Sequence, residues 1–152
     1  MDISLWDLSP KRDIKKKPIL QTGFEEKIMV FTAFPGLQHA FIESILSAGV
    51  KGVILRGFGP GNLPIAENSL LEGIKQYLSK QIPVVIGSQT AVGLTKLSLY
   101  ETGIAAKKLG AISAEDMTLE STITKLMWSL SQTNDIEQIR VLMGKNVAGE
   151  KQ

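Results

Sequence analysis

The chain has 152 residues, the size of one ordinary domain, and a domain of this length buries roughly 70% of its unfolded surface. The 17 basic and 15 acidic residues leave a net charge of +2, too small to indicate a nucleic-acid partner. The absence of cysteine excludes a disulfide framework and a thiolate metal site, and no apolar run approaches the roughly 20 residues of a membrane span.

The first 26 residues differ from the rest. Residues 9–18 are basic, bounded by Pro10 and Pro18, and have no hydrophobic period. Such a segment has too little apolar surface to offset the cost of ordering it, so we predict an exposed linker over residues 1–26 and a folded domain over 27–152. The first residues also lack the basic and apolar regions of a signal peptide, so we expect a cytoplasmic protein with no membrane partner.

From Lys27 onward, short apolar runs alternate with segments of helical period. The patterns predict strands over residues 28–33, 52–56, 82–87 and 110–113. They predict helices over residues 37–48, 68–80, 99–109, 118–130 and 135–143. Gly49 is suited to follow the first helix in a left-handed conformation, and Asp135 with Gln138 has the spacing of a capping box. The last eight residues are predicted to form a polar tail.

The order of strands and helices is typical of a parallel sheet with crossover helices. Strands that are apolar throughout indicate that helices cover both faces of that sheet. We therefore predict an α/β domain of Rossmann-like or flavodoxin-like type, with three layers and about four parallel strands.

Ligands of open parallel sheets bind outside the carboxyl ends of the strands, where two unusual loops are expected. Residues 56–64 place three glycines and two prolines around Arg56 and Asn62, and residues 87–93 include Ser88, Gln89 and Thr90. The glycine spacing does not fit a dinucleotide fingerprint or a P-loop, so the loops indicate a small polar ligand.

Purely structural roles account for the presence of these residues about as well as ligand binding does. Asn62 is suited to hold a turn, Arg56 to form an ion pair, and residues 88–90 to form an ordinary polar loop. His39, the single histidine, is interpreted as a helix-surface residue. No acidic or histidine cluster has metal-ligand spacing, and no nucleophile with an adjacent base is evident, so no metal, cofactor or catalytic residue is predicted in this chain.

Several motifs, in order, resemble the C-terminal domain of bacterial-type L-asparaginases. They are residues 51–64 (KGVILRGFGPGNLP), 82–90 (IPVVIGSQT), 100–103 (YETG) and 116–128 (DMTLESTITKLMW). The last motif points to the cytoplasmic, archaeal-like branch, which includes the D subunit of the tRNA-dependent glutamyl amidotransferase. The resemblance covers residues 26–144.

The resemblance implies an amidohydrolase that converts asparagine to aspartate and ammonia with a threonine nucleophile. The family's nucleophile motifs belong to an N-terminal catalytic domain, and neither occurs here. It also implies an intimate homodimer in which Asn62 and Glu101 complete the neighbouring subunit's active site. Arg56, Ser88, Gln89 and Thr90 correspond to an allosteric asparagine site in some type I members, although relatives often have cysteine at the position of Thr90.

The chemistry of an amino-acid ligand suits these assignments. Its carboxylate matches the planar fork of Arg56, and its ammonium matches the Glu101 carboxylate and the amide oxygen of Asn62. Three interpretations follow: an asparaginase C-terminal domain, which we favour, the equivalent domain of the amidotransferase subunit, or a stand-alone asparagine-binding regulatory module. In all three, the isolated chain is expected to be inactive.

Overall fold

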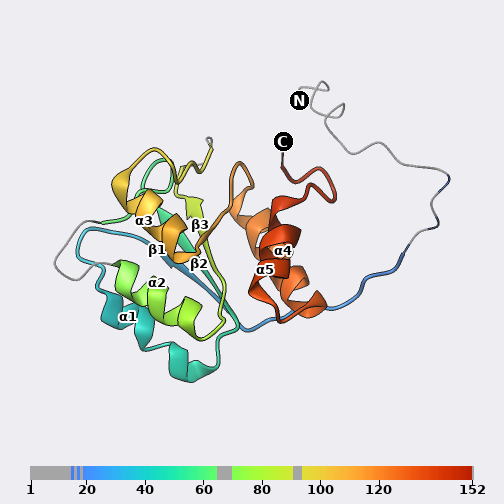
Figure 1. Ribbon diagram of the computed structural model, residues 1–152, viewed down its shortest axis with the longest axis horizontal. Coiled ribbons are helices and arrows are strands. Elements are labelled where there is room, and N and C mark those ends of the chain that lie inside the picture. Colours follow the sequence, from blue (N-terminus) through green and yellow to red (C-terminus); the bar gives the residue numbers. More distant parts are fainter. Residues whose placement is uncertain (1–14, 16, 18, 65–69, 91–93, 152) are drawn as a thin grey trace.

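The computed structural model describes residues 15, 17, 19–64, 70–90 and 94–151 (Figure 1). In chain order its elements are β1 (Ile28–Thr32), α1 (His39–Glu43), the short 3-10 helix η2 (Leu46–Ala48), β2 (Gly52–Gly57), α2 (Leu70–Ser79), β3 (Val84–Ser88), α3 (Glu101–Leu109), β4 (Ile112–Ser113), α4 (Leu119–Gln132) and α5 (Ile136–Gly144). None of the helices in these ranges is long and apolar enough to cross a membrane.

The four strands form one parallel sheet in the order β1-β2-β3-β4. Strands adjacent in the sheet are thus consecutive in sequence, and crossovers of one hand then place their helices on one face. Figure 1 shows α1, α2 and α3 on one side of the sheet and α4 and α5 on the other. The predicted three-layer α/β architecture with four parallel strands is confirmed.

Two hydrophobic clusters fill the spaces between the layers because successive strand residues point to opposite faces. Leu55 and Ile86 pack with the α1–α3 layer, whereas Ile54 and Val85 pack with α4 and α5. The two central strands are buried on both sides, which explains their continuous apolar sequences.

The segment predicted as one helix over residues 37–48 is instead two short helices, α1 and η2. Ser44 and Ser47 donate their hydroxyls to the carbonyl oxygens of Phe41 (2.7 Å) and Ser44 (3.1 Å), respectively. Such local bonds compete with a continuous helix. Within α1, Ile42 is buried, while the neighbouring Phe41 is 60% exposed. Gly49 follows η2 with φ +74°, in the left-handed conformation predicted for it.

Helix α2 places Leu70, Ile74 and Tyr77, which recur at helical spacing, in the core, where all three are fully buried. The Tyr77 hydroxyl donates to the carbonyl oxygen of Ile42 and so joins α2 to α1. Burial, with a smaller contribution from the nearby charge of Glu43, raises the pKa of Tyr77 above 10.0. The Tyr77 hydroxyl is thus a buried donor that links the two helices.

Helix α5 begins at Asp135, whose carboxylate accepts from the Glu137 N–H at 2.9 Å. The predicted capping box does not form, because the Asp135 carboxylate accepts from the N–H of Glu137 and not of Gln138, and the Asp135 N–H donates to the Thr133 hydroxyl (3.1 Å) and not to the Gln138 side chain. Asp135 thus acts as an ordinary N-cap.

Segments near both ends of the described region contact α4. Residues 19–24 are exposed, and the Gly23 carbonyl accepts from the Ser131 hydroxyl at 2.8 Å. The rest of the predicted linker, residues 1–14, 16 and 18, lies outside the described residues.

The C-terminal tail is more tightly docked than its polar sequence indicates. Lys125 of α4, itself buried, bonds to Glu150 and to the carbonyl of Lys145, and Lys151 is buried in an ion pair with Glu115. Burial by itself would raise the pKa of Glu150, but the bonds from Lys125 and from backbone N–H groups outweigh it and lower the pKa to about 2. The tail is therefore part of the fold.

Candidate ligand site at the carboxyl edge of the sheet

The carboxyl ends of β1, β2 and β3 meet at one edge, as the sequence predicts. Gln89 connects all three, because its backbone N–H donates to Gly57 O at 3.0 Å while its side-chain nitrogen Nε2 donates to Ala33 O at 2.7 Å and Arg56 O at 3.1 Å. Both polar loops follow this edge, although residues 91–93 of the second lie outside the described residues. Sequence reasoning thus located the edge correctly, and Gln89 holds it together.

Arg56 is half-buried at the end of β2. Its Nε and one terminal nitrogen lie 3.5 and 3.4 Å from the carbonyl oxygens of Ser88 and Gln89, so these hydrogen bonds are long. Within the described ranges, none of the ion pairs involves Arg56. The guanidinium is therefore held loosely at the edge and keeps donors for an anionic group.

The loop that carries Asn62 folds back on itself as a tight turn. Phe58 and Asn62 exchange backbone hydrogen bonds of 2.7 and 2.8 Å. Gly61 has φ +98°, and a Cβ there would lie 2.8 Å from Thr95 Cγ2. Gly61 thus allows the turn to pack tightly against Thr95 and Leu97.

The side chain of Asn62 is fixed by its neighbours. Its oxygen Oδ1 accepts from the Leu63 N–H at 3.1 Å and from the hydroxyl of Thr102. Thr102 is buried in the first turn of α3, directly after Glu101, whose side chain is exposed. The fold therefore brings Asn62 close to the start of α3 across 40 residues of sequence, and the oxygen that we expected to accept from a ligand's ammonium already accepts from two protein donors.

Ser88 and Thr90 form contacts within the edge. The Ser88 hydroxyl donates to Gly59 O at 2.6 Å and accepts from the Thr90 N–H at 2.9 Å, while the two hydroxyls lie 2.6 Å apart. Ser88 therefore ties the two loops together, and the exposed Thr90 hydroxyl lies at the rim.

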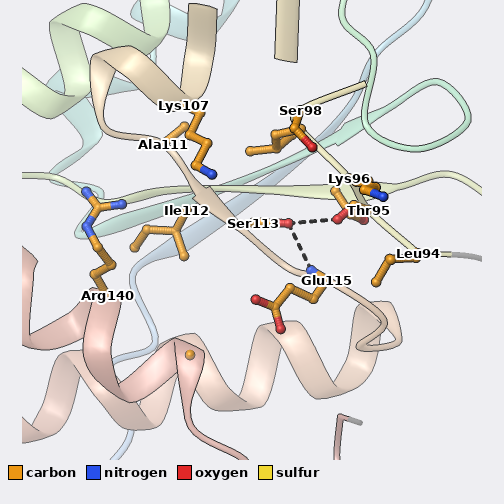
Figure 2. Close-up of a pocket in the computed structure, with 12 residues that line it drawn as sticks. Leu94, Thr95, Lys96, Ser98, Lys107, Ala111, Ile112, Ser113, Glu115 and Arg140 are labelled. Atoms are coloured by element: carbon orange, nitrogen blue, oxygen red, sulfur yellow. Dashed lines mark hydrogen bonds between the residues drawn. The ribbon is translucent and has the colours of Figure 1, made fainter. Parts of the chain in front are cut away.

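A hollow that the sequence did not indicate lies beside the edge strand β4 and has a volume of about 420 Å³ (Figure 2). Lys107 of α3, Arg140 of α5 and Glu115 extend towards it from different elements, and none of the residues predicted for a ligand lines it. Arg140 is already bonded to Gly110 O at 2.8 Å and to Glu137 at 3.1 Å. The charged side chains of this hollow come from segments that are distant in sequence, so no local sequence pattern could have revealed the hollow.

The described part of the chain contains no group of three or more histidine, aspartate and glutamate side chains that could hold a metal ion. The side chains at and near the edge differ in charge and in hydrogen-bonding capacity. Arg56, the Asn62 amide and the Glu101 carboxylate offer a cation, hydrogen-bond donors and an anion, respectively.

Comparison with known proteins gives a consistent result. Residues 27–143 match the family model described as the glutaminase/asparaginase C-terminal domain. The D subunit of glutamyl-tRNA(Gln) amidotransferase from Methanobrevibacter smithii is 37% identical over 131 residues, 86% of this chain and 29% of that protein. L-asparaginase from Thermococcus kodakarensis is 36% identical over 134 residues, 88% of this chain and 40% of the relative.

The fold is also similar to that of a solved structure. The thermostable L-asparaginase from Thermococcus kodakarensis superposes with a TM-score of 0.86 at 34% identity, over 94% of this chain and 43% of the solved chain. This chain therefore spans well under half the length of the relatives that it matches.

Proposed function

Because the chain belongs to the glutaminase/asparaginase C-terminal domain family, we propose that it is the C-terminal domain of an L-asparaginase, an amidohydrolase that converts L-asparagine and water to L-aspartate and ammonia. The similarity in sequence and fold to the Thermococcus kodakarensis enzyme supports this choice. The chain lacks both threonine nucleophile motifs of the family, so the reaction requires an N-terminal catalytic domain. We expect the enzyme to be cytoplasmic.

In this proposal the carboxyl edge binds asparagine or aspartate. Asn62 and Glu101 contribute to the active site of a neighbouring subunit, and Arg56, with Ser88, Gln89 and Thr90 around it, binds a ligand carboxylate. The observation that carries the assignment is the half-buried guanidinium of Arg56, which lies beside the Asn62 loop without a carboxylate partner among the described residues.

Titration of the ¹⁵N-labelled chain with L-aspartate, followed by NMR, tests the ligand assignment. We expect saturable shifts of backbone amides in residues 56–59, 61–63, 88–90 and 101–102. The hollow beside β4 serves as an internal control, because it also carries cationic side chains. Shifts confined to residues around Lys107 and Arg140, or no shifts up to solubility, would contradict the proposal.

An ammonia assay tests whether catalysis requires the N-terminal domain. We expect the purified 152-residue chain to release no ammonia from L-asparagine above background. Thr122 and Thr124 are not suited to act as nucleophiles. Their hydroxyls donate to the backbone carbonyl oxygens of Thr118 (2.7 Å) and Glu120 (2.9 Å) within the helix. Turnover by the pure chain would reveal a nucleophile that we have not identified.

We also propose a homodimer. Phe34 follows β1, and Leu99 and Tyr100 precede α3, so all three belong to the carboxyl edge, and each is at least half exposed. Several exposed apolar side chains at one edge of the sheet are the composition expected of an interaction surface. Sedimentation of the chain at high concentration is expected to show a reversible dimer, and a strictly monomeric protein would refute this.

The amidotransferase D subunit is the second candidate, because its identity to this chain is equally high. The coding sequence upstream of Met1 separates the candidates: a tRNA-interacting domain there favours the amidotransferase, and a catalytic domain alone favours the asparaginase. No in-frame upstream domain would favour a stand-alone regulatory module.

A further inference from the structure

Thr102 and the backbone of Leu63 enclose one end of the Asn62 side chain. The Leu63 N–H lies 3.1 Å from Asn62 Oδ1 and 3.2 Å from the Thr102 hydroxyl oxygen, so one donor serves two acceptors. The Thr102 hydroxyl also bonds to Asn62 Oδ1. Thr102 is only 7% exposed, so water cannot readily replace it in this arrangement.

These contacts determine which end of the amide faces the protein. If the amide were rotated by half a turn, its NH₂ group would face the Leu63 N–H, and two donors would oppose each other. Since the Thr102 oxygen accepts from Leu63, its own proton is free to bond to Asn62 Oδ1. The oxygen of Asn62 is therefore turned inward, and the two N–H bonds of Nδ2 point away from this contact. No described residue accepts a hydrogen bond from Nδ2.

We propose that Thr102 is a positioning residue that holds the Asn62 amide with its NH₂ group towards the ligand, so that Asn62 recognises a carboxylate or carbonyl oxygen and not an ammonium. This inference rests on the proposed function for its ligand, a small amino acid. The ligand's ammonium is then left to a carboxylate, and the exposed Glu101 is adjacent to Thr102 in the first turn of α3.

Substitution of Asn62 tests the sign of this interaction in the two-domain enzyme, in which the proposed N-terminal catalytic domain completes the site, and all binding measurements below use that enzyme as the parent. Asn62→Asp has the same shape but replaces the two outward donors with an acceptor. At pH 7 we expect L-aspartate to bind roughly ten-fold more weakly or worse, because two carboxylates then face each other. Tighter binding by Asn62→Asp would show that Asn62 meets the ammonium and would overturn the proposal.

Substitution of Thr102 tests the positioning role. Thr102→Val keeps the shape but removes the hydroxyl, and Thr102→Ser keeps the hydroxyl. We expect roughly ten-fold weaker L-aspartate binding for the valine variant and binding within about two-fold of the parent for the serine variant. Equal loss in both variants would assign Thr102 a packing role only.

The Asn62 side-chain NH₂ signals in NMR spectra give a readout that does not depend on the ligand. In the parent and in Thr102→Ser they should form one sharp pair from a single orientation, and in Thr102→Val they should broaden or double. If the parent binds no L-aspartate, the proposed ligand and the carboxylate assignment both fail, while these signals still decide whether Thr102 orients the amide. If Thr102→Val does not fold, the serine variant and Asn62→Asp decide the question.

Discussion

The side-chain amide of Gln89 donates to the backbone carbonyl oxygen of Ala33 over 2.7 Å, although the two residues lie 56 positions apart. A polar side chain at the end of β3 thus satisfies a carbonyl just beyond β1, two strands away. The same nitrogen also reaches Arg56 O in the strand between them. Gln89 therefore links the segments that follow β1, β2 and β3 at this edge.

Replacing Gln89 should therefore destabilise the fold. Gln89→Leu leaves the Ala33 and Arg56 carbonyls without this donor, and we expect the free energy of unfolding to fall by about 1–3 kcal/mol. Gln38→Leu is a matched control, because Gln38 is exposed and its side chain forms no capping bond to α1. Urea denaturation measures both variants, and equal stabilities would show that the Gln89 amide contributes nothing.

Arg56 should affect binding more than stability. Its two hydrogen bonds in the fold are long, so Arg56→Ala is expected to change the free energy of unfolding by less than about 1 kcal/mol. Loss of a charge-assisted contact should weaken L-aspartate binding by roughly ten- to a hundred-fold. Calorimetry on Arg56→Ala and on the control Arg140→Ala checks this, and unchanged affinity in Arg56→Ala would remove Arg56 from the site.

Two helical glycines should respond in opposite directions to substitution by alanine. A Cβ on Gly103 would lie 2.6 Å from the Leu97 carbonyl oxygen, whereas one on Gly73 has no atom closer than 3.6 Å. We expect Gly73→Ala to stabilise the chain by up to about 1 kcal/mol, since alanine favours helices. Gly103→Ala should lower stability by about 1–3 kcal/mol. Thermal melts compare them, and a stabilised Gly103→Ala would show that α3 does not need this close approach.

Docking of the C-terminal tail should depend on pH through Glu150. Its pKa falls from 4.5 to about 2 in the fold, so the docked tail binds this proton less tightly than the free tail does. The stabilisation is therefore complete above pH 4.5 and is lost as the pH falls from 4.5 towards 2, by at most about 3 kcal/mol. Glu150→Gln should remove most of this dependence.

Fluorescence of Trp128 reports the tail, because Trp128 and Glu150 line the same small hollow. The measurement uses a Trp6→Phe background, which leaves Trp128 as the single tryptophan. A transition of the same midpoint in Glu150→Gln would assign the pH dependence to another group.

The sequence predicts those parts of the molecule that depend on local pattern. The four strands and the inner face of α2 follow from apolar runs and helical period. The left-handed conformation of Gly49 follows from its position at the end of a helix. The break at Ser44 was missed, because a serine bonding to its own helix leaves no periodic signal. The contact of Thr102 with Asn62 and the burial of Lys151 depend on tertiary structure, so no sequence window contains both partners.

The sequential strand order also determines what a ribosome exposes during synthesis. Each new strand can pair at once with the strand made just before it, and its crossover helix covers the first face as it emerges. The opposite face, with Ile54 and Val85, has no cover until residues 119–144 have been made. A nascent chain paused before α4 therefore presents a bare apolar sheet, and we expect chaperones to engage it at that point and to release it once α4 and α5 have docked.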